Sequence, residues 1–216
     1  MGISEIELVT QKLAGIKYMS EVQAIVLRDH IEEYDLSNIL EIGFYQGKST
    51  AYFAAILKER GKGHITTIDK ISALRHDPGI EKNLETVGLS NHVTPIFCER
   101  SHTWELGKMV SSPNRPSFDL CYFDGGHTWD VTGFGFVLVD LLLKPGGWII
   151  FDDLDWTIKK SPAAIENNYS SYRNYSADER STPGVRMVFE NLVPARGYIN
   201  TFEKMGWGFA QKPMTP

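Results

Sequence analysis

The chain has 216 residues, enough for one domain with a full hydrophobic core. Apolar residues make up 42% of it and charged residues 23%, which is ordinary for a globular protein. The net charge of −5, without a lysine- or arginine-rich stripe, argues against a nucleic-acid partner. No apolar run reaches bilayer length and no signal-peptide pattern opens the chain, so we expect a soluble cytoplasmic protein with no membrane partner.

The chain begins with apolar side chains at helical spacing, which predict helices over residues 3–34 with a break near residues 14–20. Strand and helix patterns then alternate. The expected strands are 38–42, 64–68, 93–98, 118–123 and 148–151, and the helices between them are 49–60, 77–87, 102–110 and 131–143. This alternation predicts a parallel sheet covered by helices on both faces.

The pattern changes beyond Asp155. Residues 157–182 are polar, and the stretch 167–180 is long for a loop, which indicates a substrate lid or a mobile segment. Residues 184–192 are expected to be helical. Residues 198–204 and 207–211 are expected to form an antiparallel hairpin at the sheet edge.

The fold class that we predict is α/β. It is a Rossmann-like, doubly wound and mostly parallel seven-stranded sheet with a C-terminal antiparallel hairpin. Residues 1–216 are expected to form a single domain. Its parts are an N-terminal helical segment (1–35), a cofactor- and metal-binding core (36–156), a substrate lid (157–183), and a C-terminal helix and hairpin (184–216).

Two expected strands end in clustered carboxylates. Asp124 follows the apolar residues of the run CYFDGGH (121–127), and Asp152 and Asp153 follow those of the run WIIFDDLD (148–155). The carboxyl ends of parallel strands are where open α/β sheets bind ligands, and three acids meeting there are costly unless a cation neutralises them. The pattern predicts a hard divalent metal beside a small-molecule site. The alternative is a helix-capping or solvated acid pair.

A glycine turn, EIGFYQGKS (41–49), joins the first expected strand to its helix. Gly43 permits a tight turn, Gly47 permits close backbone approach, and the helix N-terminus offers free N–H groups to a ligand. The spacing fits neither G-x-G-x-x-G nor a P-loop. Asp69 ends the second strand, where an acid can accept both hydroxyls of a ribose. Together they favour a nucleoside site over a plain connecting turn followed by a solvated acid.

The ordered set of glycine turn, Asp69, Asp124-x-x-His127 and Asp152-Asp153 resembles the class I S-adenosylmethionine-dependent methyltransferases. Within that class the chain is similar to metal-dependent O-methyltransferases of the catechol and caffeoyl-CoA kind. It is also similar to macrolide-sugar O-methyltransferases with D-G-x-H and D-D motifs. The resemblance covers roughly residues 20–156, and the trailing hairpin also suits this class.

The resemblance implies two cofactors, S-adenosylmethionine and Mg²⁺ or a similar divalent cation. The residues expected to contact the amino-acid and ribose part of S-adenosylmethionine are Glu41, Gly43, Phe44, Tyr45, Gly47, Ser49 and Thr50. Asp69 would hold the ribose hydroxyls. Arg100 and Ser101 would flank the adenine, although the family commonly has Gly-Asp/Ala-Ser where this chain has Glu99-Arg100-Ser101. The cation ligands would be Asp124, Asp152 and Asp153, with Asp124 also contacting the methyl donor.

The predicted chemistry is methyl transfer to a positioned oxygen nucleophile. A bound divalent cation lowers the pKa of a coordinated alcohol or phenol and fixes its position. His127 lies three residues beyond Asp124 and could take the hydroxyl proton as a general base. Asp124 and His127 are therefore the predicted catalytic residues. The alternative for His127 is a histidine that holds the loop.

We therefore predict an S-adenosylmethionine-dependent, divalent-metal-assisted O-methyltransferase. Its partner would be a small hydroxylated molecule, either a natural-product sugar or a catechol-like phenol. The alternatives are a metal-independent N- or carboxyl-methyltransferase and a non-catalytic nucleoside-binding protein of the same fold. A hydroxylase-like relative would need a redox metal, for which no distinct ligand set is evident. Because relatives of this kind are often dimeric or larger, we expect a homo-oligomer.

Two residues outside these motifs are assigned by composition alone. His102 shows no metal-ligand spacing with other histidines, so a surface position is expected. Trp104 is expected in the core or on a pocket wall, because tryptophan is highly buried on average.

Overall fold

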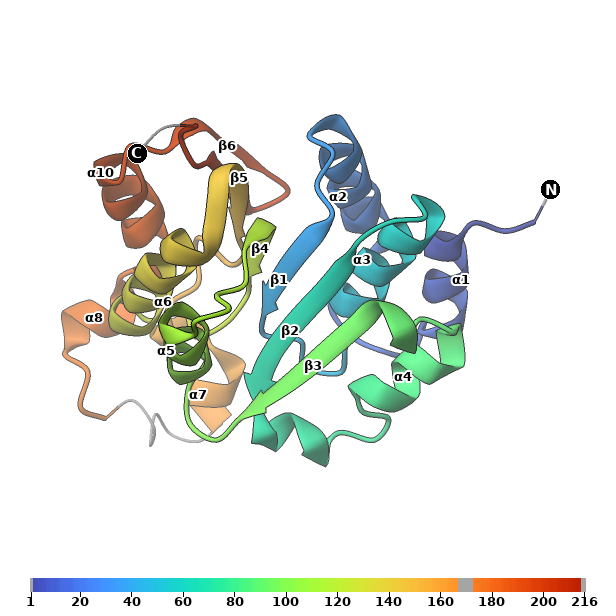
Figure 1. The fold of residues 1–216 in the computed structure, drawn as a ribbon. Helices are drawn as coiled ribbons and strands as arrows, with labels where there is room; N and C mark the ends of the chain where they lie inside the picture. Colours follow the sequence, from blue (N-terminus) through green and yellow to red (C-terminus); the bar gives the residue numbers. More distant parts are fainter. Residues whose placement is uncertain (1, 167–172, 215–216) are drawn as a thin grey trace.

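A computed structural model describes residues 2–166 and 173–214 (Figure 1). Its centre is a seven-stranded sheet in the order β3-β2-β1-β4-β5-β7-β6. Strands β1 to β5 run parallel, β7 pairs antiparallel with β5, and β6 pairs antiparallel with β7. The strands are β1 (Asn38–Ile42), β2 (His64–Lys70), β3 (Val93–Cys98), β4 (Phe118–Phe123), β5 (Leu143–Phe151), β6 (Ile199–Lys204) and β7 (Trp207–Gln211). The predicted fold class is confirmed.

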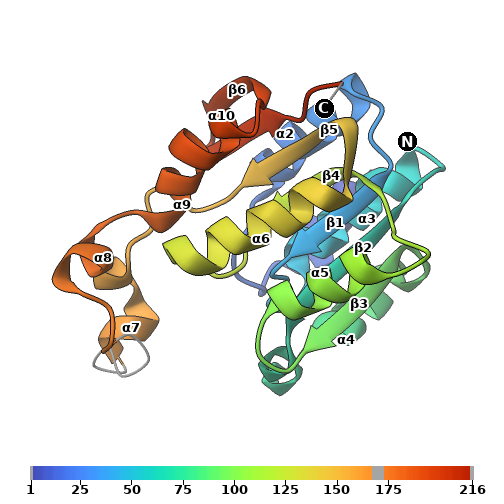
Figure 2. The ribbon, with the colours of Figure 1, turned by 60° about the vertical axis from the view of Figure 1, so that its left-hand side comes forward.

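Helices cover both faces of the sheet (Figures 1 and 2). One face carries α1 (Glu5–Lys12), α2 (Glu21–Glu33), α3 (Lys48–Glu59) and α4 (Ile80–Val87), with the short turns η1 (Ile71–Arg75) and η2 (Ser90–His92). The other carries α5 (His102–Ser111), α6 (Trp129–Leu142), α9 (Gly184–Met187), the π-helical η5 (Val188–Leu192) and α10 (Val193–Ala195). The short segments η3 (Ile158–Lys160), α7 (Pro162–Glu166) and α8 (Ala177–Ser181) follow β5.

The hydrophobic core lies in two layers, one on each side of the sheet. Successive strand residues point to opposite faces, so Ile39 packs with α1 to α4 while Leu40 packs with α5, α6 and α9. Tyr122 and Phe123 divide between the two layers in the same way. Because both faces are buried, the central strands β1 and β4 carry apolar residues at successive positions rather than only at alternate ones, and this made them recognisable in the sequence.

Most predicted elements agree with the structure. The bounds of β1, β3 and β4 match the expected strands residue for residue, and Met205 and Gly206 join the hairpin as expected. β5 begins earlier than expected, because Leu143 already pairs with Phe118 across a register shift. In the stretch expected to be a substrate lid or a mobile segment, the described residues form the three short helical segments η3, α7 and α8, and residues 167–172 lie outside the described residues. None of the described helices has the length and apolar character to cross a membrane.

A very close backbone approach fixes the end of β1 against the end of β4. Gly43 has a φ of +88°, and a Cβ on it would lie 2.0 Å from the backbone carbonyl oxygen of Asp124. The Gly43 N–H donates to the carbonyl of Ile68 at 2.8 Å, and the Asp124 N–H donates to the carbonyl of Ile42 at 2.8 Å. Backbone contacts therefore hold the glycine turn against the loop that begins at Asp124.

Gly43→Ala should destabilise the protein by at least about 3 kcal/mol, because it combines a left-handed backbone with steric overlap. Gly61→Ala is the matched control: Gly61 also has a positive φ, but nothing lies within 4 Å of its added Cβ. That variant should lose only about 1–2 kcal/mol. Urea unfolding measures both, and equal losses would refute the packing argument.

Candidate active site

A cavity of about 610 Å³ opens at the carboxyl ends of the parallel strands, a volume that suits a small-molecule ligand. Nine of the predicted site residues lie on its wall: Gly43, Phe44, Tyr45, Ser49, Asp69, Asp124, His127, Asp152 and Asp153. The glycine turn, Asp69 and the loops that follow β4 and β5 thus meet at one cavity, as the strand-end positions predicted.

Five other predicted cofactor residues do not line the cavity: Glu41, Gly47, Thr50, Arg100 and Ser101. Glu41 and Thr50 are buried, and Gly47 is the N-cap of α3. Ser101 caps α5 by accepting the N–H of Thr103 at 3.2 Å, and Arg100 is exposed. Their contacts with a cofactor stay predictions.

The segment between α1 and α2 forms part of the wall, and its role was not anticipated from the sequence. Lys17, Tyr18 and Met19 all line the cavity. The Tyr18 ring meets the Tyr45 ring edge-on at a centroid distance of 5.3 Å, and the Lys48 ammonium donates to the carbonyl of Ile16 at 2.9 Å. These contacts join segments far apart in the chain, so local periodicity showed only the break between the helices.

Asp69 holds the glycine turn in shape. One carboxylate oxygen accepts the N–H groups of Phe44 at 3.0 Å and Tyr45 at 2.7 Å, and the other accepts the N–H of Lys70 at 2.6 Å. Tyr45 has a φ of +50°, so its turn adopts a backbone conformation that non-glycine residues rarely adopt. The carboxylate also lines the cavity, where its remaining lone pairs can accept hydroxyl groups.

Glu41 is enclosed by hydroxyl donors. Its carboxylate accepts hydrogen bonds from Ser49 at 2.6 Å, Thr50 at 2.5 Å and Thr67 at 2.6 Å. Burial raises the pKa of Glu41 to about 7, while the three hydroxyls oppose that rise. The acid at the end of β1 therefore couples β1 to β2 and α3.

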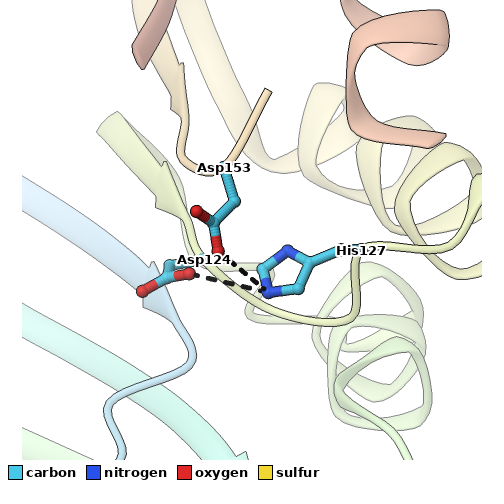
Figure 3. A group of neighbouring side chains, drawn as sticks. All are labelled: Asp124, His127 and Asp153. Atoms are coloured by element: carbon cyan, nitrogen blue, oxygen red, sulfur yellow. Dashed lines mark ion pairs between the residues drawn. The ribbon is translucent and has the colours of Figure 1, made fainter. Parts of the chain in front are cut away.

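The side chains of Asp124, His127 and Asp153 lie close together where the loops after β4 and β5 meet (Figure 3). The His127 Nε2 atom lies 3.5 Å from the Asp153 carboxylate and 4.0 Å from that of Asp124. One ligand atom from each residue lies within 4.8 Å of the others. Two carboxylates and an imidazole at this spacing fit a divalent cation with oxygen and nitrogen ligands.

Asp152 makes different contacts. The Tyr122 hydroxyl donates to one of its carboxylate oxygens, and the Asp153 N–H donates to the other at 2.7 Å. Asp152 lines the cavity, but the candidate cation cluster contains His127 in its place. Whether His127 is a ligand or a base, and whether Asp152 turns toward a cation, stay predictions.

The acidic cluster is electrostatically costly. Burial and the neighbouring carboxylates of Asp152 and Asp153 raise the pKa of Asp124 well above its ordinary value. Burial and Asp152 also raise the pKa of Asp153, although His127 opposes this rise. Burial lowers the pKa of His127, against the attraction of Asp153 and Asp152. A bound cation would relieve the repulsion, so the donor set fits the predicted metal.

The sequence matches one family model, described as a methyltransferase domain, over residues 40–154. The chain belongs to this methyltransferase family. The matched segment contains the glycine turn, Asp69 and both acidic loops, so the predicted class of enzyme is confirmed. No curated protein matches the sequence.

Solved methyltransferases have the same fold. The O-methyltransferase TomG from Streptomyces achromogenes, in complex with S-adenosylmethionine, is 16% identical with a TM-score of 0.67, covering 99% of this chain and 91% of that one. An O-methyltransferase from Bacillus cereus with S-adenosylhomocysteine is 23% identical with a TM-score of 0.63, covering 98% and 90%. MycE of mycinamycin biosynthesis, with Mg, S-adenosylhomocysteine and mycinamycin VI, is 13% identical with a TM-score of 0.62, covering 99% and 56%.

Glu41 should make the stability of this methyltransferase depend on pH. Because its pKa is raised from 4.5 to about 7, the folded state binds a proton more tightly than the unfolded state does. The stabilising effect is complete below about pH 4.5 and is lost as the pH rises to about 7, a change of at most about 3 kcal/mol.

In Glu41→Gln this contribution should disappear, so the free energy of unfolding of the variant should fall less over that pH range. Urea unfolding at several pH values measures the difference. Glu85→Gln, at an exposed position, is the control and should follow the wild-type curve. Parallel curves for wild type and Glu41→Gln would contradict the raised pKa.

Proposed function

We propose that this methyltransferase is a cytoplasmic, S-adenosylmethionine-dependent and divalent-metal-assisted O-methyltransferase. Its acceptor would be a small hydroxylated molecule, a natural-product sugar or a catechol-like phenol. The observation that carries the proposal is the cluster of Asp124, His127 and Asp153 on the wall of the cavity that also contains the glycine turn and Asp69.

In this proposal, the donor and the acceptor bind at different parts of the cavity wall. Gly43, Tyr45 and Asp69 come from the ends of β1 and β2, and they would hold the methyl donor. His127 and Asp153 come from the loops after β4 and β5, and they would face the acceptor. Because the strands are neighbours in the sheet, a donor and an acceptor bound there would be held side by side, which favours in-line transfer.

The acceptor hydroxyl must lose its proton, and His127 is suited to receive it. The Asp153 and Asp124 carboxylates lie 3.5 Å and 4.0 Å from its Nε2 atom (Figure 3), and they would stabilise the imidazolium once the proton has moved. The Trp156 ring lies 5.0 Å from the imidazole ring and limits its rotation. The side chain is 19% exposed, so it stays accessible to a bound acceptor.

The same carboxylates would hold the cation. Asp124 and Asp153, joined by Asp152 or His127, would supply the ligands, and a bound divalent cation supplies a Lewis acid that lowers the pKa of the acceptor hydroxyl. The S-adenosylmethionine of TomG and the Mg of MycE, two proteins with this fold, support both cofactor assignments. The candidate cation cluster also favours an oxygen acceptor over the amine or carboxyl acceptor of a metal-independent methyltransferase.

Calorimetric titration with S-adenosylmethionine and with Mg²⁺ tests both assignments on the same protein. Asp69→Ala should weaken S-adenosylmethionine binding by about 10–100-fold while Mg²⁺ binding is unchanged. Asp153→Asn should weaken Mg²⁺ binding by about 100-fold while cofactor binding is kept. Asp155→Asn is the matched control, since this nearby acid is 77% exposed and pairs with Arg186.

The reverse pattern, or no cofactor binding by the wild type, would refute the proposed sites. Cofactor binding without any Mg²⁺ binding would instead favour the metal-independent methyltransferase. Equal losses in Asp153→Asn and Asp155→Asn would mean that the Asp153 effect is general to this loop.

His127→Ala distinguishes the two roles of the histidine. As a general base, His127 should be needed for turnover, with a loss of about 10²–10⁴-fold, while Mg²⁺ and S-adenosylmethionine bind normally. As a cation ligand, it should be needed for Mg²⁺ binding as well. Turnover is measured by methyl transfer across sugars and phenols, and unchanged turnover would restrict His127 to holding the loop.

A further inference from the structure

Helix α6 has almost no polar surface. After Asp130, the exposed positions of α6 are Phe134, Val137 and Leu141, with 57%, 41% and 45% of their surface accessible. These three residues, the α6 stripe, recur at helical spacing and therefore lie on one face of the helix. A surface helix normally carries charged or polar residues there, so the α6 stripe is an apolar surface that folding of one chain does not bury.

The α6 stripe lies at the centre of a helical layer. Figure 2 shows α6 between α5 on one side and the α9–α10 segment on the other. Trp104 of α5 is 71% exposed and Met187 of α9 is 37% exposed, so apolar side chains also protrude from the flanking helices. The cavity opens at the carboxyl ends of the strands, and a partner lying along α6 would leave it accessible.

We propose that the α6 stripe is the centre of a homodimer interface, in which α6 packs antiparallel on α6 of a second copy about a two-fold axis at Val137. Such an interface uses the same patch on both subunits, so the patch must be complementary to itself. Around an axis at Val137, Phe134 of one copy lies opposite Leu141 of the other to within one residue. A large side chain thus meets a medium one on each side of the axis.

The charges at the two ends of α6 also fit an antiparallel arrangement. Asp130 is exposed near the N-terminal end and lies close enough to Glu179 for the two acids to interact. Lys144 follows the C-terminal end, at the start of β5. Its ammonium pairs with Asp119 of the same chain at 2.5 Å, and its side chain stays 44% exposed, so a second acid can still approach it. Asp130 and Lys144 both lie seven residues from Val137, so the axis brings Asp130 of each copy to Lys144 of the other. A parallel arrangement would instead place acid against acid.

The exposed apolar area suits a second copy. If large apolar side chains have about 150–250 Å² of surface each, the exposed fractions of the α6 stripe, Trp104 and Met187 correspond to roughly 400–600 Å². A standard interface buries about 800 Å² per partner, of which somewhat more than half is apolar. One helical layer therefore supplies the apolar part of a stable dimer.

Sedimentation equilibrium of the full chain tests the proposal. The wild type should have twice the 24.4 kDa mass of one chain at micromolar concentration. Val137→Glu should be monomeric, with at least a 100-fold weaker dimer, because two carboxylates would meet on the axis. Val22→Glu is the control: Val22 is 61% exposed on α2, on the opposite face of the sheet, and its dimer should be unchanged.

Disulfide crosslinking tests the register. Val137→Cys should form an intermolecular disulfide on mild oxidation, because a residue on a two-fold axis meets its own copy, while Val22→Cys should not. Both native cysteines are buried, so they should not interfere. Asp130→Cys combined with Lys144→Cys should also crosslink, and Asp130→Cys alone should not.

Three results would overturn the proposal: a monomeric wild type, a dimer that Val137→Glu leaves intact, or Asp130→Cys alone as the best crosslinker. Unchanged circular dichroism and S-adenosylmethionine binding in Val137→Glu would show that the variant is folded. Wild-type binding to phosphatidylcholine vesicles that Val137→Glu abolishes would identify a lipid surface as the occupant instead. None of these readouts depends on the identity of the acceptor or on metal binding.

Discussion

Repulsion among carboxylates is the constraint on which the site depends. β4 and β5 are parallel neighbours with Phe123 paired to Phe151, so the register itself brings Asp124 close to Asp152 and Asp153. The backbone holds the acids in this arrangement, because the Asp124 carbonyl packs directly against Gly43, in the space where a side chain at residue 43 would lie. The acids must therefore be stabilised where they are.

The fold stabilises these acids with whatever donors the neighbouring backbone supplies. Asp152 accepts hydrogen bonds from the Tyr122 hydroxyl and one N–H group, and the Nε2 atom of His127 faces both Asp124 and Asp153. Neither arrangement places a full positive charge among the acids, since burial lowers the pKa of His127. The remaining unfavourable energy is what a divalent cation would gain on binding. The same cluster of carboxylates therefore lowers the stability of the metal-free protein and raises its affinity for a cation.

Glu41 is a single buried acid, and its contacts differ from those of the acids after β4 and β5. Three hydroxyls from β2 and α3 surround it, and it stabilises the junction of those elements without reaching the cavity wall. From the sequence, the acid at the end of β1 is predicted to contact a cofactor. The hydroxyl side chains that enclose it were visible in the sequence, but their direction was set by the packing of α3 against β2. Residue type and position predicted the acid, and only the three-dimensional contacts gave its partners.

The same distinction explains which predictions came from the sequence. Buried strands are short apolar runs ended by glycine or by acids, so β1, β3 and β4 were predicted to the residue and the strand-end acids with them. Side-chain partners depend on contacts between distant segments. Tyr122 lies in a buried strand, and the sequence gives no sign that its hydroxyl donates to Asp152. Tyr18 reaches the cavity only because the break between α1 and α2 packs on the glycine turn.

Two expectations failed for a related reason, and both concern the layer of α5 and α6. Trp104 was expected inside and is exposed, while His102 was expected at the surface and is 7% exposed. The reversal follows from the rotation of α5 about its axis, which places His102 and Leu106 inward. Tryptophan is buried on average, but on a short helix the positions of the other apolar residues decide which face turns inward. A tryptophan on the outward face forms an exposed apolar surface that a partner can cover.

His102 also connects the two regions on which function is proposed to rest. Its ring occupies the space that side chains at Gly125 and Gly135 would need, with ring atoms 3.1 Å and 2.9 Å from the respective Cβ positions. Gly125 belongs to the loop between Asp124 and His127, and Gly135 lies on α6 next to Phe134 of the α6 stripe. Burial lowers the pKa of His102 to about 4, so the ring stays neutral and acts as a packing element at neutral pH. A shift of α6 would therefore meet the acidic loop directly through this ring, and rigid packing of α6 against a second copy would help to hold the loop in place.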